Sequence, residues 1–269
     1  MLPLLLLILL SLHGEAASSS PDDGQFAYQG FAGANLTLDG LAALLPGGLL
    51  ALTNFTYQTK AHAFHPTPIR FLNRPAATNA TAAARSFSTS FVFAIVSRYD
   101  GLSDHGLAFV VAPTTDFAAA NAGQYLGLLN ATNGAASDPI LAVELDTILT
   151  PEFRDLNSNH VWVDYDGRSK QLEVTLSPLH TPKPRKPLLS EAIDLSSLMA
   201  DAMYVGFSAS SGSCSRTTTC SGGASAWTGP PRRLTSPSFQ PCHAWDPSLG
   251  PRSWMSCCRS PPRCSSPRR

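Results

Sequence analysis

The chain has 269 residues, of which 43% are hydrophobic and 14% are charged, and its formal net charge is +0. This length and composition allow one all-β domain with a sizeable core. The balanced charge gives no reason to expect nucleic acid as a partner.

The first sixteen residues have the composition of a secretory signal peptide. Residues 1–12 are almost wholly apolar, and small residues follow at Gly14, Ala16 and Ala17. We expect cleavage after Ala16. No other stretch is long and apolar enough to span a bilayer, so the sequence predicts a secreted, extracellular chain without a membrane span.

Glycosylation sequons agree with secretion. The N-x-[ST] pattern occurs at Asn35, Asn54, Asn79 and Asn130. One such match arises readily by chance, but four in a chain with a signal peptide predict that some of them are glycosylated.

Short β-like runs separated by turn residues follow the leader. They lie at 26–31, 35–38, 49–53, 85–96, 106–112 and 170–178. The run from Arg85 to Val96 alternates so that Phe87, Phe91, Phe93 and Ile95 share one face, which is typical of a core strand in a β-sandwich.

The stretch from residue 141 to residue 160 is the richest in possible metal ligands. It opens with apolar residues that alternate with acids: Leu141, Val143 and Leu145 against Glu144 and Asp146. Period two places both carboxylates on one face of a strand, where they repel each other unless a cation, a proton or a donor lies between them. Asp155 and His160 follow on a loop, and this set suits Ca²⁺ beside a transition metal such as Mn²⁺. The alternative is a strand whose acids face solvent and a histidine that is there by chance.

This stretch resembles the metal loop of the legume (L-type) lectins. The motifs FAYQGF, ANLTLDG and GLLALTN followed by QTKAHAF resemble the start of the lectin domain of plant receptor kinases. The resemblance runs from about Phe26 to Ser211. It implies an all-β fold, a concanavalin A-like jelly-roll β-sandwich, which we expect to be incomplete for the reasons given below.

The resemblance implies ligands for one Ca²⁺ and one Mn²⁺ or another transition metal. They are Glu144, Asp146, Ile148 through its carbonyl, Thr150, Asp155 and His160. Thr150 stands where the family has an asparagine that binds both Ca²⁺ and sugar. Because a threonine hydroxyl reaches less far than an amide oxygen, we expect metal and glycan binding to be weakened or lost.

The resemblance also implies a carbohydrate site. In the family, an aspartate directly before the glycine of the strand at 106–112 binds sugar hydroxyls; here His105 has that position and Asp104 precedes it. Gly123 and Gln124 match a second sugar loop, and Thr150 completes the set. The alternatives are an exposed turn at 104–105 and, at 123, a turn that leads into a strand.

The family pattern breaks after Val161. The chain continues directly with WVDYDG from Trp162, a motif that normally lies well downstream. The sequence therefore predicts a missing internal segment near 161/162 and the loss of the strand after the metal histidine, which would leave ladder groups unpaired.

A second break follows Ser213, and all six cysteines lie beyond it. The tail at 214–269 allows three interpretations: a disordered basic segment, a disulfide-bonded module, or translation out of frame. Our hypothesis is the third, that the residues after Ser213 are out of frame and carry no evolved function.

The sequence thus predicts a signal peptide at 1–16, a legume-lectin-like domain at 17–213 and a tail at 214–269. We expect an apoplastic, metal-assisted binder of glycans or glycoconjugates, with a homo-oligomer left open; the full-length relative would lie in the plasma membrane. The alternatives are a non-functional truncated product and a glycoside hydrolase of the same fold. Ile148 and Leu149 stand where the hydrolases carry their second carboxylate, so we predict no catalytic residue and no enzyme.

Overall fold

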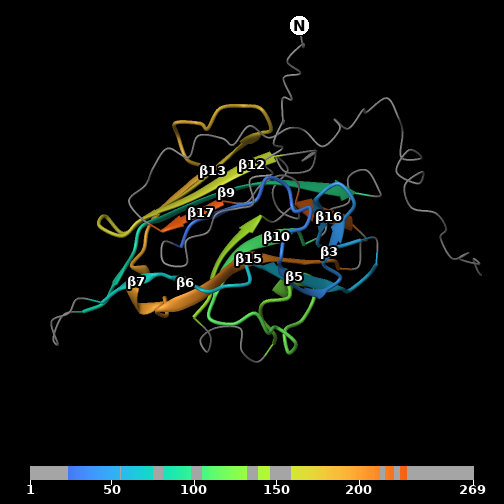
Figure 1. Cartoon of the computed structure of the whole chain (residues 1–269), viewed down its shortest axis with the longest axis horizontal. Helices are drawn as coiled ribbons and strands as arrows, with labels where there is room; N and C mark the ends of the chain where they lie inside the picture. Colours follow the sequence, from blue (N-terminus) through green and yellow to red (C-terminus); the bar gives the residue numbers. More distant parts are fainter. Residues whose placement is uncertain are drawn as a thin grey trace, which may run out of the picture. The chain divides into compact units, whose positions relative to one another are not determined.

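Two antiparallel sheets account for almost all regular structure in the computed structural model (Figure 1). The structure describes residues 24–54, 56–74, 81–97, 105–131, 139–145, 159–212, 216–220 and 225–228. All of these lie in the first of two compact units, Met1–Phe239; the second, Gln240–Arg269, lies outside the described residues.

The larger sheet has nine strands among the described residues, in the order β14-β13-β12-β9-β16-β4-β3, with β17 pairing to both β9 and β1. Its strands are β1 (Phe26–Ala27), β3 (Ala43–Leu45), β4 (Leu49–Ala51), β9 (Phe87–Ser97), β12 (Asn159–Asp166), β13 (Gln171–Pro178), β14 (Leu189–Ala192), β16 (Arg216–Cys220) and β17 (Ser225–Thr228).

The smaller sheet has six strands among the described residues, in the order β11-β10-β15-β5-β2, with β6 pairing to β15. Its strands are β2 (Thr37–Gly40), β5 (Lys60–Phe64), β6 (Ile69–Arg70), β10 (Leu107–Ala112), β11 (Leu141–Leu145) and β15 (Ala202–Ser210). A separate hairpin pairs β7 (Leu72–Asn73) with β8 (Ala83–Ala84), and two short 3₁₀ turns, η1 (Gly123–Tyr125) and η3 (Leu195–Ser197), complete the regular elements.

The main core lies between the inner faces of the two sheets. Side chains alternate along a strand, and β9 turns Phe87, Phe91, Phe93 and Ile95 inward, as the sequence predicts. The Phe91 ring touches the ring of Phe109 in β10 (centroid distance 6.0 Å) and that of Phe207 in β15 (4.9 Å). These aromatic contacts join the two sheets.

Strand β12 runs through Val161 and Trp162 without interruption. It pairs with β9 on one side and with β13 on the other along this junction. Asn159 and His160 extend the WVDYDG strand and keep its alternation, so the ladder is paired at this point. The expected loss of a strand that would leave ladder groups unpaired stays a prediction. The missing internal segment itself stays a prediction. In the six-stranded sheet, β11 stands last in the strand order and, among the described residues, pairs with β10.

Part of the tail belongs to the nine-stranded sheet. β17 pairs with the first half of β9, and β16 pairs with its second half and with β4. For residues 216–220 and 225–228 the expectation of disorder is wrong, since the threonine-rich run has high β-propensity and finds the free edge of β9. The reading frame of the tail stays a prediction, and residues 229–269 lie outside the described residues.

Candidate functional site

Three residues of the expected carbohydrate site lie together at one end of the six-stranded sheet. His105 lies just before β10, whose first residue, Leu107, pairs with Leu145 at the end of β11. Gly123 begins η1, and a Cβ atom added to it would lie 3.6 Å from His105 Nε2. Gln124 follows and is exposed. The structure therefore brings His105, Gly123 and Gln124 together, while Asp104 and Thr150 lie outside the described residues.

One row of paired residues crosses the outer face of this sheet from edge to edge: Glu144, Ala108, Ser208, His62 and Asp39. The predicted alternation in β11 is confirmed, because Leu141, Val143 and Leu145 are buried and Glu144 is exposed. Glu144 thus lies on the same face as Ser208 and His62.

A long connection after β10, which we call the 117–129 loop, covers this outer face. Phe117 packs its ring parallel to His62 (centroid distance 5.0 Å) and to Phe64 (5.8 Å) of β5. Phe64 and Phe117 belong to a second, smaller apolar cluster with Leu126 and Leu128. The loop is therefore seated on the sheet by apolar packing as well as by polar contacts.

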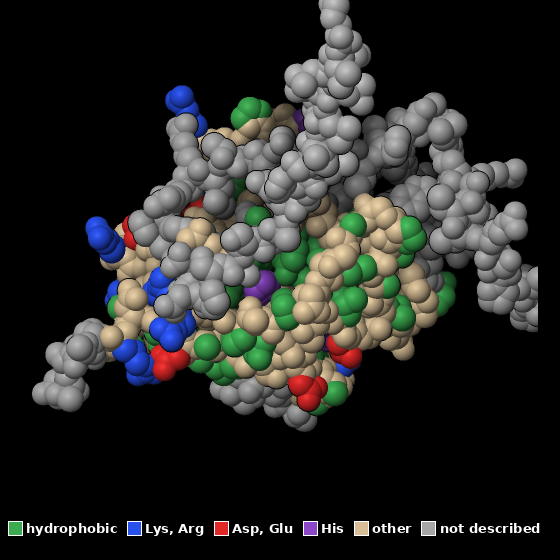
Figure 2. All heavy atoms as spheres, viewed as in Figure 1, with side chains coloured by type: hydrophobic (Ala, Val, Ile, Leu, Met, Phe, Trp, Pro, Cys, Tyr) green, Lys and Arg blue, Asp and Glu red, His purple; other side chains and the backbone are tan. Residues whose placement is uncertain are grey.

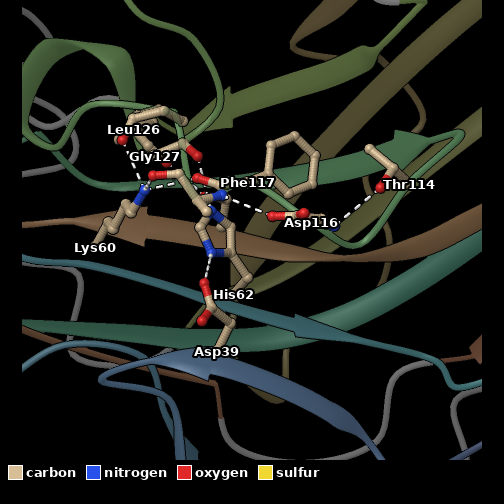
Figure 3. Close-up of polar contacts among 11 residues, drawn as sticks. Asp39, Lys60, His62, Thr114, Asp116, Phe117, Leu126 and Gly127 are labelled. Carbon is tan, nitrogen blue, oxygen red and sulfur yellow. Dashed lines mark hydrogen bonds and ion pairs between the residues drawn. The ribbon is translucent and has the colours of Figure 1, made fainter.

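Lys60 of β5 donates three hydrogen bonds to the 117–129 loop. Its Nζ donates to the carbonyl oxygens of Phe117 (2.6 Å), Ala118 (2.9 Å) and Ala120 (2.7 Å). An ammonium group has three donors, and all three point at the same turn (Figure 3).

His62, fully buried, connects β2 to the loop. Its Nε2 lies 2.7 Å from the carbonyl oxygen of Gly127, and its Nδ1 lies 3.1 Å from Asp39 Oδ2. A carbonyl oxygen only accepts, so Nε2 carries the hydrogen in this contact. Figure 3 shows the imidazole ring held between Asp39 and the loop.

Two buried serines of β15 complete the support. Ser210 Oγ donates to the carbonyl oxygen of Gly123 at 2.7 Å, and Ser208 Oγ donates to that of Leu126. Sequence reasoning missed Lys60, His62, Ser208 and Ser210. The available signal was polar residues at every second position of otherwise apolar runs, in KAHAF and FSAS.

His160 lies in the other sheet. Val161, Val163 and Tyr165 of β12 face the main core, so His160 and Trp162 face outward from the nine-stranded sheet. The two rings stack with centroids 3.8 Å apart. Burial lowers the pKa of His160 to about 4, and the positive charge of Lys183 acts in the same direction.

Glu144 and His160, the two expected metal ligands among the described residues, are not brought together. Glu144 and His160 face outward from two sheets stacked at a distance of about 10 Å, so they cannot bind one ion. The physical reason is the continuous β12, which fixes His160 between β9 and β13. Asp146, Ile148, Thr150 and Asp155 lie outside the described residues, and within the described ones no three His, Cys, Asp or Glu side chains form a metal-binding group.

The expected glycosylation sites differ in exposure. Asn35 and Asn54 are exposed, and Asn130 is half-buried. Asn54 Oδ1 accepts a hydrogen bond from the backbone N–H of Thr56 at 2.8 Å, and Asn130 Nδ2 donates to the carbonyl oxygen of Ala119 at 3.2 Å. Asn79 lies outside the described residues.

The view of the surface in Figure 2 shows charged side chains of both signs in small groups, with no broad field of one sign. No helix among the described residues is long and apolar enough to cross a bilayer.

Comparison with known proteins places these observations in a family. The model of the legume lectin domain matches residues 23–164 and 160–222, two segments that overlap at residues 160–164 around Val161 and Trp162. The L-type lectin-domain containing receptor kinase SIT1 of Oryza sativa subsp. japonica is 45% identical over 246 residues, which cover 77% of this chain and 36% of that protein. The L-type lectin-domain containing receptor kinase IV.1 of Arabidopsis thaliana is 42% identical over 235 residues, covering 72% and 34% respectively.

The chain therefore spans about a third of the length of these curated relatives, 36% and 34%. Among solved structures, the lectin from Bauhinia forficata in complex with GalNAc has a TM-score of 0.60 at 24% identity and covers 77% of this chain and 99% of that one. The predicted fold class, a β-sandwich of the legume lectin type, is confirmed.

Proposed function

The chain belongs to the legume lectin domain family, and on this basis we propose that it is an extracellular carbohydrate-binding module whose partners are glycans or glycoconjugates. The observation that carries the proposal is the proximity of His105 to Gly123 at the end of the six-stranded sheet, where a Cβ atom added to Gly123 would lie 3.6 Å from His105 Nε2. Both positions match the family's sugar-binding loops, and they come from segments that only the fold brings together.

The chemistry of these residues suits sugar hydroxyls. An imidazole offers one donor and one acceptor, the exposed Gln124 amide offers both, and the backbone N–H of the Gly123 loop adds a donor. Because Gly123 has no side chain, a ligand can approach the backbone closely. A small open site of this kind gives weak binding, with a Kd of about 1 mM corresponding to about −4 kcal/mol.

Metal assistance is not part of this proposal. Glu144 and His160 face outward from different sheets, which speaks against one ion bound by both; the other expected ligands lie outside the described residues. We therefore assign glycan recognition to the protein groups named above and derive no step from a bound ion.

A binding role rather than catalysis is the better proposal for this site. Retaining and inverting hydrolysis both need two carboxyl groups that flank the glycosidic bond. The positions expected for the second carboxylate hold Ile148 and Leu149. The relatives are receptor kinases with a lectin domain, and we propose a corresponding extracellular location for this chain, with sugars attached at the exposed Asn35 and Asn54.

A glycan array tests the proposal with the full chain secreted from eukaryotic cells. We expect binding to at least one class of glycan, and a drop of about tenfold or more in His105→Ala. The control is His180→Asn, at an exposed histidine in the loop after β13. A chain that melts cooperatively and yet binds no glycan at millimolar concentration would overturn the proposed function.

A further inference from the structure

The 117–129 loop, which carries Gly123 and Gln124, is held by side chains of two neighbouring strands. We propose that Lys60 and His62 of β5, together with Ser208 and Ser210 of β15, are the positioning residues of the glycan site. They fix the loop through protein contacts, so the position of the loop does not depend on a bound metal ion. This inference rests on the proposed function.

Lys60 supplies the positive charge at the turn Phe117–Ala120. Three carbonyl oxygens of the loop converge on its Nζ at 2.6, 2.7 and 2.9 Å. Hydrogen bonds from a charged donor are stronger than neutral ones. The ammonium group therefore holds the turn at Phe117–Ala120 with its own charge, and no further cation is needed there.

His62 and the serines hold the second half of the loop. The carbonyl oxygens of Gly123, Leu126 and Gly127 each accept a hydrogen bond from β15 or β5. Asp39 fixes the imidazole ring from the side opposite the loop. Of these contacts, the bond from Ser210 to Gly123 acts nearest to His105, so it places the two candidate sugar-binding positions relative to each other.

The loop backbone lies close to the side chains of β5 and β15 at Gly127, whose φ is +73°. A Cβ atom there would lie 3.0 Å from both His62 Nε2 and Lys60 Cβ, and 3.3 Å from Ser208 Oγ. The backbone thus lies directly on the side chains that hold it. A loop fixed in this way loses little freedom when a ligand binds, and if only a tenth of the molecules had the loop in place, the observed Kd would rise about tenfold.

The test combines glycan affinity with hydrogen exchange of the loop, measured on the full chain before and after treatment with EDTA and after addition of Ca²⁺. We expect the amides of the 117–129 loop to be protected equally in all three states. The Kd for the best array glycan should stay within about twofold, because six carbonyl oxygens of the loop already accept hydrogen bonds from Lys60, His62, Ser208 or Ser210.

Variants separate positioning from general stability. Lys60→Met keeps the length of the side chain and removes its donors; we expect faster exchange in the loop, unchanged exchange in β9 and β12, and a Kd about tenfold higher. Lys60→Arg should restore a large part of the loop protection and of the glycan affinity. Ser210→Ala, a smaller change, should raise the Kd less. The matched control is Lys183→Met, which removes an ion pair to Asp164 on the nine-stranded sheet and should leave loop and affinity unchanged.

Two results would overturn the inference: loss of loop protection and of binding in EDTA with recovery in Ca²⁺, or a Lys60→Met variant with wild-type exchange and affinity. A different result bears on the proposed function. If the wild type binds no glycan while its loop protection resists EDTA and requires Lys60, the glycan site is refuted and the positioning of the loop is supported.

Discussion

Replacing Gly127 with alanine should be the most disruptive single methyl addition in the 117–129 loop. Two effects act against the variant. A left-handed φ of +73° costs an L-residue about 1–2 kcal/mol, and the new Cβ would press against His62 and Lys60 at 3.0 Å, where overpacking costs about 1–3 kcal/mol. Alanine also reduces the conformational entropy of the unfolded chain, which offsets about 0.4–1 kcal/mol of this loss. The expected net loss is about 1–5 kcal/mol.

Gly33→Ala is a matched control for the backbone effect alone. Gly33 has a φ of +70°, and nothing lies within 4 Å of an added Cβ. Urea denaturation of both variants isolates the contact, because the backbone cost and the unfolded-state effect are nearly equal in the two. We expect Gly127→Ala to lose about 1–3 kcal/mol more than Gly33→Ala. Equal losses would refute the close seating of the loop on β5.

Further predictions concern the other sheet and the core. Burial lowers the pKa of His160 from 6.5 to about 4. The contribution of neutral His160 to the free energy of unfolding is therefore present above pH 6.5 and is lost as pH falls toward 4, by about 2 kcal/mol at pH 5. Urea titrations at pH 7 and 5 should show this loss in the wild type and not in His160→Phe, and equal losses in both proteins would contradict it. Phe91→Ala should cost about 3–5 kcal/mol in the same assay, since the ring joins the two sheets, and a loss below about 1 kcal/mol would speak against that contact. A chain that ends at Ser213 lacks β16 and β17 and should not melt cooperatively in calorimetry, whereas a chain that ends at Thr228 should. Cooperative melting of the shorter chain would show that β9 needs neither strand.

Patterns that depend on neighbouring residues in the chain were predictable from the sequence. The alternation in β9, β11 and β13 reports burial on one face, and the structure places Phe91, Val143 and Val174 in the core. The strand at 26–31 shortens to Phe26–Ala27, because the next residues form turns. Local alternation specifies which face of a strand is buried better than it specifies where the strand ends.

Pairing between distant strands was not predictable in the same way. Nothing in the local sequence shows that Lys60 stands opposite Ser210, or that both reach one loop. The spacing from Glu144 to His160 matches a metal loop, yet the sheet that each side chain enters depends on which strands they pair with. A continuous ladder with β9 and β13 decided the position of His160.

The junction in β12 has a consequence for how such a chain tolerates loss of sequence. If an internal segment is missing here, as the sequence predicts, the strand stays intact because the residues on both sides of the junction keep the same alternation. Asn159-His160-Val161 and the following Trp162-Val163 join in phase, so Val161 and Val163 both reach the core. One residue more or less at this point would turn every later side chain of the strand to the opposite face. A deletion within a β-strand therefore keeps the buried face when it removes an even number of residues, whatever the length of the deletion.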